Sequence, residues 1–526
     1  MKNWYWWVFS VIMLGSLGLR IWYSTGHVSF NYDQARDALI AREIRGGDIK
    51  IMGPSASGTQ DSVYHGVLFY YVIALLYAIA HGDPQVVAYS LAALSTLGLI
   101  PVFLFARQYF QSPKPALLIT TFTGFSLMTV SYSAWISEHI MGLVFLPWYV
   151  YFSYQLFEKY SLKKLLIVCF FLGLLEQSAV FNLYWGLPLL LILINSIKTK
   201  AAVVRTIIQD ALLGALVFFS VISTMILTQV VMYSRGIFSL DSLAKFTAKG
   251  TQPILEKLAY VFREHVLDTV QLILLPGLTN LLSFALILTA IYLLVRFGKT
   301  HFGRKWEFPL YFLAAPFALL LAYGTASEIW VGFDSIVYIV IVAGFYSFYK
   351  NFHERKPKVI DAVSLLLLCT FIGMHTQALV EQKRQKDDFW RLPVQVGFNL
   401  SDQLSLIYVT YAQADHKMFS VDSLTDPYGI NVVWAYLYMW YGQNEYGYTP
   451  VFTGPSQAGY LSENILSEDK TKLAQDSKHF VMVEPESTIG ESVLDVFNHR
   501  QTEFGYRSQI LSFETLELQV YHPSSN

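Results

Sequence analysis

The sequence is poor in charged residues and in cysteine. Only 14% of its 526 residues are Asp, Glu, Lys or Arg, whereas a soluble domain has about 25%. The net charge of -1 gives no reason to expect nucleic acid as a partner. The two cysteines, Cys169 and Cys369, both lie inside apolar runs. This pattern provides neither a disulfide framework nor the ligand spacing of a zinc site.

Long apolar runs fill the first two thirds of the chain. Hydrophobic residues make up 54% of the sequence and aromatic residues 16%, and a run of about 18 apolar residues indicates a membrane span. The first run follows Lys2 and is longer than the apolar core of a cleaved signal peptide, so we expect it to be retained. The runs cover residues 4–23, 64–81, 85–106, 115–132, 139–157, 165–181, 183–197, 206–232, 272–295, 309–326, 330–349 and 359–380.

The charges of the connecting loops predict the topology. Short basic loops usually face the cytoplasm. If Tyr64–His81 crossed the membrane, all five basic loops would lie outside. If it does not cross, all five lie inside. We therefore expect Tyr64–His81 to be an interfacial helix on the outer face, with eleven spans and a cytoplasmic N-terminus. The loops contain Arg107 and Lys114; Lys159, Lys163 and Lys164; Lys198, Lys200 and Arg205; Arg296, Lys299, Arg304 and Lys305; and Lys350, Arg355, Lys356 and Lys358.

The composition changes near Glu381. Charged residues become frequent beyond it, and the alternating stretches 479–485 and 516–523 are typical of β-strands. The predicted fold is an all-α polytopic membrane domain over residues 1–380, followed by a small extracytoplasmic α/β domain over residues 381–526. The second part has about 145 residues, which is enough to bury a core of its own.

The loop after the first span contains several candidate functional residues. Good helix formers predict a helix over Gln34–Arg45, ended by Gly46 and Gly47. Asp33 precedes this helix, where an aspartate commonly caps backbone N–H groups. Asp33, Arg36 and Asp37 share one helix face, and their ordinary interpretation is a solvated ion pair.

The same loop resembles that of a known family. The stretch Tyr32-Asp33-Gln34-Ala35-Arg36, then Ala41, Gly47-Asp48 and His65 before an aromatic helix, is similar to the first outer loop of GT-C membrane glycosyltransferases. Protein O-mannosyltransferases and lipid A aminoarabinose transferases are the members it resembles most. His65-Gly66-Val67-Leu68 replaces the family's His-Pro-Pro-Leu, and Gln34 replaces an acidic residue. The resemblance implies a GT-C fold with a non-spanning juxtamembrane segment, which the loop charges require independently.

The resemblance also implies a chemistry. A sugar on a polyprenyl phosphate would be attacked by an acceptor that loses a proton, so Asp33 is the expected general base. The phosphate needs a cation, and Arg36 is the expected one. Tyr32 and His65 are expected to bind substrate beside them. Arg42, Arg45, Arg235 and Arg263 are alternative phosphate ligands.

Further candidates lie in later outer loops. Glu138 is expected to be a second catalytic carboxylate, with His139 binding substrate beside it. Two polar residues at a helix start explain the pair equally well. No cofactor is required by this chemistry, and a divalent cation is left open. Gln177 is expected to line the donor cavity, and Arg235 to contact the donor phosphate from the loop 233–271.

The sequence thus predicts a glycosyltransferase of the bacterial plasma membrane. Its partners would be a polyprenyl-phosphate-linked sugar, a lipid, glycan or protein acceptor, and membrane lipids. A transporter or lipid-sugar flippase is the main alternative, but we find no repeated halves with interrupted helices. A non-catalytic scaffold is a further alternative.

Overall fold

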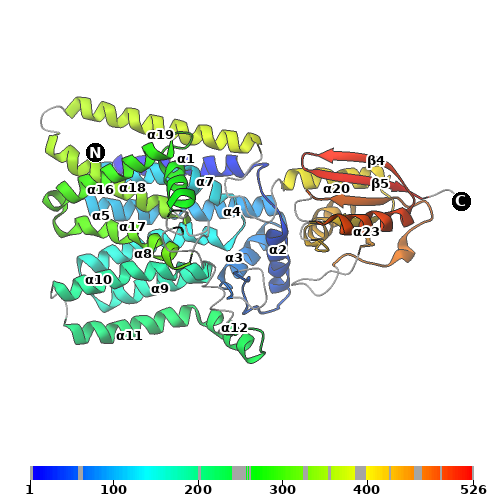
Figure 1. Ribbon diagram of the computed structural model, residues 1–526, viewed down its shortest axis with the longest axis horizontal. Coiled ribbons are helices and arrows are strands. Elements are labelled where there is room, and N and C mark those ends of the chain that lie inside the picture. Colours follow the sequence, from blue (N-terminus) through cyan, green and yellow to red (C-terminus); the bar gives the residue numbers. More distant parts are fainter. Residues whose placement is uncertain are drawn as a thin grey trace.

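The computed structural model describes residues 4–56, 63–199, 203–239, 256, 259, 262–323, 330–352, 357–385, 399–425, 428–454, 465–485 and 489–523. A bundle of long helices lies at one end of the molecule and an α/β domain at the other (Figure 1). Two short helices near the start of the chain, α2 (Tyr32–Arg45) and α3 (Leu68–Ile79), lie between them.

The bundle confirms a membrane domain made of helices. Within the described residues, seven helical segments are long and apolar enough to cross a membrane, or eight if α6 and α7, bent by 52°, form one span. Eleven spans therefore stay a prediction. The helices are α1 (Trp4–Ser24), α4 (Pro84–Thr96), α5 (Leu99–Phe110), α6 (Pro113–Phe125), α7 (Leu127–Ser133), α8 (Gly142–Glu158), α9 (Leu162–Ser178), α10 (Gly186–Lys198), α11 (Val204–Val221), α12 (Ser223–Ser234), α15 (Asp268–Leu274), α16 (Asn280–Phe302), α17 (Phe308–Tyr323), α18 (Phe333–Phe352) and α19 (Pro357–Gln385).

The segment Tyr64–His81 does not form a helix of spanning length. Its helix α3 has 12 residues, which corresponds to about 18 Å. The hydrocarbon core of a bilayer is about 30 Å thick. This agrees with the loop-charge argument, which required this apolar run not to cross.

Basic loops gather at one end of the bundle. Lys305 pairs with Glu158 at 2.6 Å, so the loops after α16 and α8 lie together. The Arg107 guanidinium lies 4.8 Å from the ring centre of Tyr5, so the end of α5 lies beside the start of α1. This end is opposite α2 and α3 (Figure 1). Lys356, in the last basic loop, is outside the described residues.

The C-terminal part contains a five-stranded sheet in the order β2-β1-β3-β5-β4. β1 (Ser420–Leu424) is parallel to β2 (Val451–Phe452) and β3 (His479–Val483). β5 (Leu516–His522) is antiparallel to β3 and to β4 (Tyr506–Phe513). The strands predicted at 479–485 and 516–523 are thus confirmed as β3 and β5. The accompanying helices are α20 (Leu400–Gln413), α21 (Val432–Leu437), α22 (Gln443–Tyr446) and α23 (Glu491–Gln501).

The sheet domain docks on the loop that follows α1. The Leu400 amide donates to the Val28 carbonyl at 2.9 Å, and Gln403 Nε2 donates to the Phe30 carbonyl at 2.8 Å. The Tyr436 hydroxyl donates to the Gly82 carbonyl at 2.6 Å. Because the first two contacts hold the segment that leads into α2, and α2 carries Asp33, the sheet domain helps to position the candidate site.

Candidate active site

Helix α2 carries the first part of the site. Its N-cap is Asn31, which forms a capping box with Gln34, and Gln34 Oε1 accepts from the Asn31 amide at 3.2 Å. The interpretation of Asp33 as the N-cap is therefore wrong, because the helix begins at Tyr32 and Asn31 caps its first turn. The Asp33 carboxylate is left for other interactions.

Asp33, Arg36 and Asp37 form one cluster on α2. Arg36 donates from Nη1 to Asp33 Oδ1 at 2.6 Å. It also donates from Nε and Nη2 to Asp37 Oδ1 at 2.9 and 2.7 Å. Arg36 and Asp37 are buried, whereas 48% of the Asp33 side chain is exposed. The interpretation as a solvated surface ion pair therefore fits Asp33 but not the other two residues.

Burial and charge act against each other in this cluster. Burial lowers the pKa of Arg36, but the charges of Asp37 and Asp33 outweigh it and raise that pKa well above its ordinary value. Burial raises the pKa of Asp37 to about 7, against the opposing effect of Arg36. Arg36 is thus a permanent cation, and it also lies 5.7 Å from the ring centre of Tyr32.

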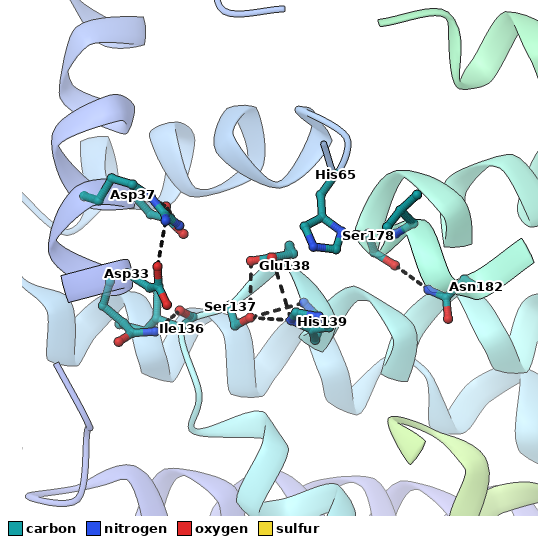
Figure 2. A network of polar contacts seen from close by, with 12 residues as sticks. Asp33, Asp37, His65, Ile136, Ser137, Glu138, His139, Ser178 and Asn182 are labelled. Atoms are coloured by element: carbon teal, nitrogen blue, oxygen red, sulfur yellow. Dashed lines mark hydrogen bonds and ion pairs between the residues drawn. The ribbon is translucent and has the colours of Figure 1, made fainter. Parts of the chain in front are cut away.

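A second polar group lies beside the first. We call residues 134–141 loop two; it follows α7. Gln34 Nε2 donates to the Ile136 carbonyl at 3.1 Å, which joins α2 to loop two (Figure 2). Glu138 is buried here, and the Ser137 hydroxyl contacts both Glu138 Oε2, at 3.2 Å, and His139 Nδ1, at 2.8 Å.

His65 completes the second group. It precedes α3, and its ring centre lies 5.8 Å from that of His139. Ligand atoms of His65, Glu138 and His139 all lie within 4.8 Å of one another, a spacing that could hold a metal ion. Figure 2 shows the three side chains facing a common space, with Asp33 and Asp37 to one side. The sequence did not reveal that His65 joins the Glu138–His139 pair.

Backbone contacts hold His65 in place. The Gly66 amide donates to the Gln177 carbonyl at 3.0 Å, and the Val180 amide donates to His65 Nδ1 at 3.0 Å. A Cβ at Gly66 would lie 2.6 Å from the Gln177 carbonyl oxygen. This contact explains why glycine replaces the first proline of the family pattern, since proline has no N–H to donate.

The two remaining candidates are the side chains of Gln177 and Arg235. Gln177 Nε2 donates to the Val221 carbonyl at 2.6 Å and contacts Thr224 Oγ1 at 3.1 Å, so its amide joins α9 to the α11–α12 turn. Arg235 is exposed just after α12. No described contact joins either side chain to the two groups, and their substrate contacts stay predictions.

Three contributions were missed from the sequence. Asp37 was placed on the face of Asp33 and Arg36, but its two hydrogen bonds to the guanidinium were not expected. Ser137 connects Glu138 with His139. Val180 acts through its backbone, and no side-chain pattern indicates that.

A helical membrane bundle that carries this polar cluster below an α/β domain has the GT-C architecture. Among solved structures, the chain is similar to ArnT from Cupriavidus metallidurans bound to undecaprenyl phosphate, with a TM-score of 0.56 and 12% identity over 97% of each chain. Residues 64–227 match the family model described as dolichyl-phosphate-mannose-protein mannosyltransferase. No curated protein matches the chain. The chain thus has a helical membrane fold similar to that of ArnT, and part of it matches a mannosyltransferase family model.

Proposed function

We propose that the chain transfers a sugar from a polyprenyl-phosphate-linked donor to a lipid, glycan or protein acceptor on the extracytoplasmic face of the membrane. The observation that carries this proposal is the Asp33–Arg36–Asp37 cluster, which combines a reachable carboxylate with a fixed cation. The similar ArnT structure is bound to undecaprenyl phosphate, which supports a polyprenyl-linked donor.

We propose a role for each residue of the cluster. Asp37 fixes the buried guanidinium through two hydrogen bonds. Arg36 then presents Nη1 to the donor phosphate, since guanidinium groups bind phosphate oxygens well. In the free protein Nη1 is bonded to Asp33. Phosphate binding at Nη1 would displace Asp33 and free its carboxylate for proton transfer.

The bond changes follow from these positions. The acceptor oxygen or nitrogen forms a bond to the anomeric carbon, and its proton passes to Asp33. The bond between the anomeric carbon and the phosphate oxygen breaks, and its electron pair stays on the polyprenyl phosphate. Arg36 stabilises that negative charge. The leaving group is already an ionised phosphate, so no general acid is needed.

The second group lies where it could orient the sugar or the acceptor. Glu138 supplies the second carboxylate, and His65 and His139 bind polar groups beside it. Tyr32 contributes an aromatic face next to Arg36. Arg235 offers an exposed cation at the end of α12 for the approaching lipid phosphate. Gln177 acts on this site through its carbonyl, which holds the segment of His65.

The proposed orientation places the N-terminus in the cytoplasm of a bacterium and the sheet domain outside. It is supported by the basic loops at the end of the bundle opposite α2 and α3. Basic loops mark the cytoplasmic side. The candidate site would then face the compartment in which lipid-linked sugars are used.

A transfer assay tests the proposal. Purified protein in lipid nanodiscs is incubated with undecaprenyl-phosphate-linked sugars and with membrane lipid extracts, and the products are identified by mass spectrometry. We expect a sugar-modified product that requires the donor. A parallel proteoliposome assay measures movement of the same donor across the bilayer. Movement without a covalent product would instead support a flippase, and neither activity would support a scaffold.

A further inference from the structure

The space bounded by His65, Glu138 and His139 has a hydrogen-bonding pattern that selects its ligand. His65 and Glu138 are 5% and 7% exposed, and the three ligand atoms lie within 4.8 Å of one another. Two histidines and a carboxylate are a common zinc ligand set. The spacing alone therefore allows a metal ion. The positions of the protons on the histidine rings decide whether a metal ion or a hydrogen-bonding group fits.

The proton on His65 is fixed by the backbone. The Val180 N–H donates to His65 Nδ1, and a backbone amide can only donate, so Nδ1 must carry a lone pair. Turning the ring over would place a carbon against this N–H. Burial lowers the pKa of His65 to about 4, so the ring is neutral at physiological pH. Its single proton is therefore on Nε2.

This tautomer is opposite to that of a metal ligand. A histidine that binds a metal through one nitrogen normally donates the N–H of its other nitrogen to a carbonyl or carboxylate. The outer nitrogen of His65 instead accepts. A cation at Nε2 would have to displace its proton, and a neutral ring would then carry that proton on Nδ1, where it breaks the Val180 hydrogen bond. His65 thus presents a hydrogen-bond donor to the space, not a lone pair.

Glu138 supplies the complementary acceptor. Ser137 has one hydroxyl proton, and the charged carboxylate is its stronger acceptor, which accounts for the contact with Glu138 Oε2 at 3.2 Å. His139 Nδ1 then donates to Ser137 Oγ at 2.8 Å. The ring of Trp135 stacks on His139 at 5.3 Å and fixes its orientation. Glu138 is held in place with acceptor capacity remaining.

We propose that this space binds a hydroxyl group of a carbohydrate substrate, with His65 Nε2–H donating to its oxygen and Glu138 accepting its proton. A hydroxyl both donates and accepts, which matches one donor beside one acceptor. Two atoms that each hydrogen-bond one oxygen at about 2.8 Å stand roughly 4.6 Å apart, and a ring nitrogen of His65 lies within 4.8 Å of a Glu138 carboxylate oxygen. The inference rests on the proposed function and makes His65 and Glu138 specificity-determining residues.

Substitutions of His65 separate a hydrogen bond from a metal bond. In His65→Gln, an amide N–H takes approximately the position of Nε2–H, so the donor is retained. In His65→Asn, the amide oxygen takes approximately the position of Nδ1 and keeps the Val180 hydrogen bond, but the donor is lost. We expect His65→Gln to stay within about tenfold of the parent transfer rate. His65→Asn and His65→Ala should lose about 10- to 100-fold.

Two further measurements complete the test. The metal content of the purified protein is measured by inductively coupled plasma mass spectrometry before and after treatment with EDTA. We expect no stoichiometric zinc. Binding is compared for undecaprenyl phosphate and undecaprenyl-phosphate mannose. If the hydroxyl belongs to the donor, the preference for the mannosyl lipid falls in His65→Asn. If it belongs to the acceptor, donor binding is unchanged and the acceptor KM rises.

The outcomes that contradict the inference differ from those that contradict the function. One zinc per chain, lost in His65→Gln together with activity, overturns the inference, as does a His65→Asn variant with parental binding and KM. A parent protein that neither binds polyprenyl-phosphate lipids nor transfers sugar contradicts the proposed function itself, and the inference that rests on it. Equal elution of all variants on size-exclusion chromatography controls for folding.

Discussion

Arg36 donates from two nitrogens to one oxygen of Asp37, at 2.9 and 2.7 Å. Its third contact, from Nη1, reaches Asp33 at 2.6 Å. Asp37 is buried, whereas about half of the Asp33 side chain is exposed. Two aspartates one helical turn apart therefore differ in function: one fixes the cation, and the other can reach a substrate.

Asp33→Asn should nearly abolish transfer without loss of stability. A lost general base costs about 10²–10⁴-fold in rate. The side chain is half exposed, and the cap of α2 is Asn31, so folding does not depend on the carboxylate. The check is to measure the initial transfer rate and the melting temperature of Asp33→Asn and of the parent protein. Transfer at the parent rate would show that another group accepts the proton.

Arg36 substitutions should act on donor use. Arg36→Ala removes the cation that faces the phosphate and leaves Asp37 buried without its partner. We expect weaker donor binding together with a lower melting temperature. Arg36→Lys keeps the charge but not the fork geometry, so it should recover only part of the donor binding. Measurement of KM for the donor in both variants separates them. An equal donor KM for Arg36→Lys and for the parent would mean that the two hydrogen bonds from Arg36 to Asp37 do not matter for donor binding.

The stability of the protein should depend on pH through Asp37. Burial raises the pKa of this carboxyl to about 7, whereas in the unfolded chain it is about 3.9. Between these values the folded state retains a proton that the unfolded state has released, so stability falls as pH rises from about 4 to 7. Asp37→Asn cannot titrate. The melting temperature of the parent minus that of the variant should therefore decrease over this range. An increase would mean that pairing with Arg36 outweighs burial.

The sequence predicted the elements of the site better than their assembly. The helix expected over Gln34–Arg45 is α2, Tyr32–Arg45, and its two-residue error comes from overlooking Asn31 and Gln34 as a capping box. Apolar runs and loop charges predicted that Tyr64–His81 is not a span. The meeting of His65 with Glu138 and His139 could not be predicted, because it depends on which loops fold together. The fixed tautomer of His65 depends on a backbone amide, which carries no sequence signal.

Accessibility of single cysteines should distinguish the two ends of the bundle. Both natural cysteines are first replaced by serine. Lys163→Cys lies in an exposed position in the first turn of α9, next to a basic loop, and Glu445→Cys lies in an exposed position of the sheet domain. A membrane-impermeant maleimide added to intact cells should label the second variant only. Labelling of Lys163→Cys from outside would reverse the orientation proposed here and place the candidate site in the cytoplasm.

Gly66 should tolerate no larger residue. Its amide donates to the Gln177 carbonyl at 3.0 Å, and an added Cβ would lie 2.6 Å from that oxygen. Gly66→Ala keeps the N–H that donates to Gln177 but places a Cβ against the carbonyl oxygen. Gly66→Pro adds the same Cβ and also removes the N–H. Overpacking costs about 1–3 kcal/mol and a lost hydrogen bond about 1 kcal/mol, so proline should be the more destabilising of the two.

The matched control for Gly66 is Gly186→Ala. Gly186 precedes the body of α10 with a helical φ of -64°, and no atom lies within 4 Å of its added Cβ. Alanine favours helix over glycine by about 1 kcal/mol, so this variant should melt at or above the parent temperature. Thermal unfolding of all three variants in the same detergent gives the comparison. Because Gly66 adjoins His65, the two Gly66 variants should also lose transfer activity, whereas Gly186→Ala should not. A stable, active Gly66→Pro variant would mean that proline fits here as it does in the family pattern, and that the Gln177 contact does not hold His65.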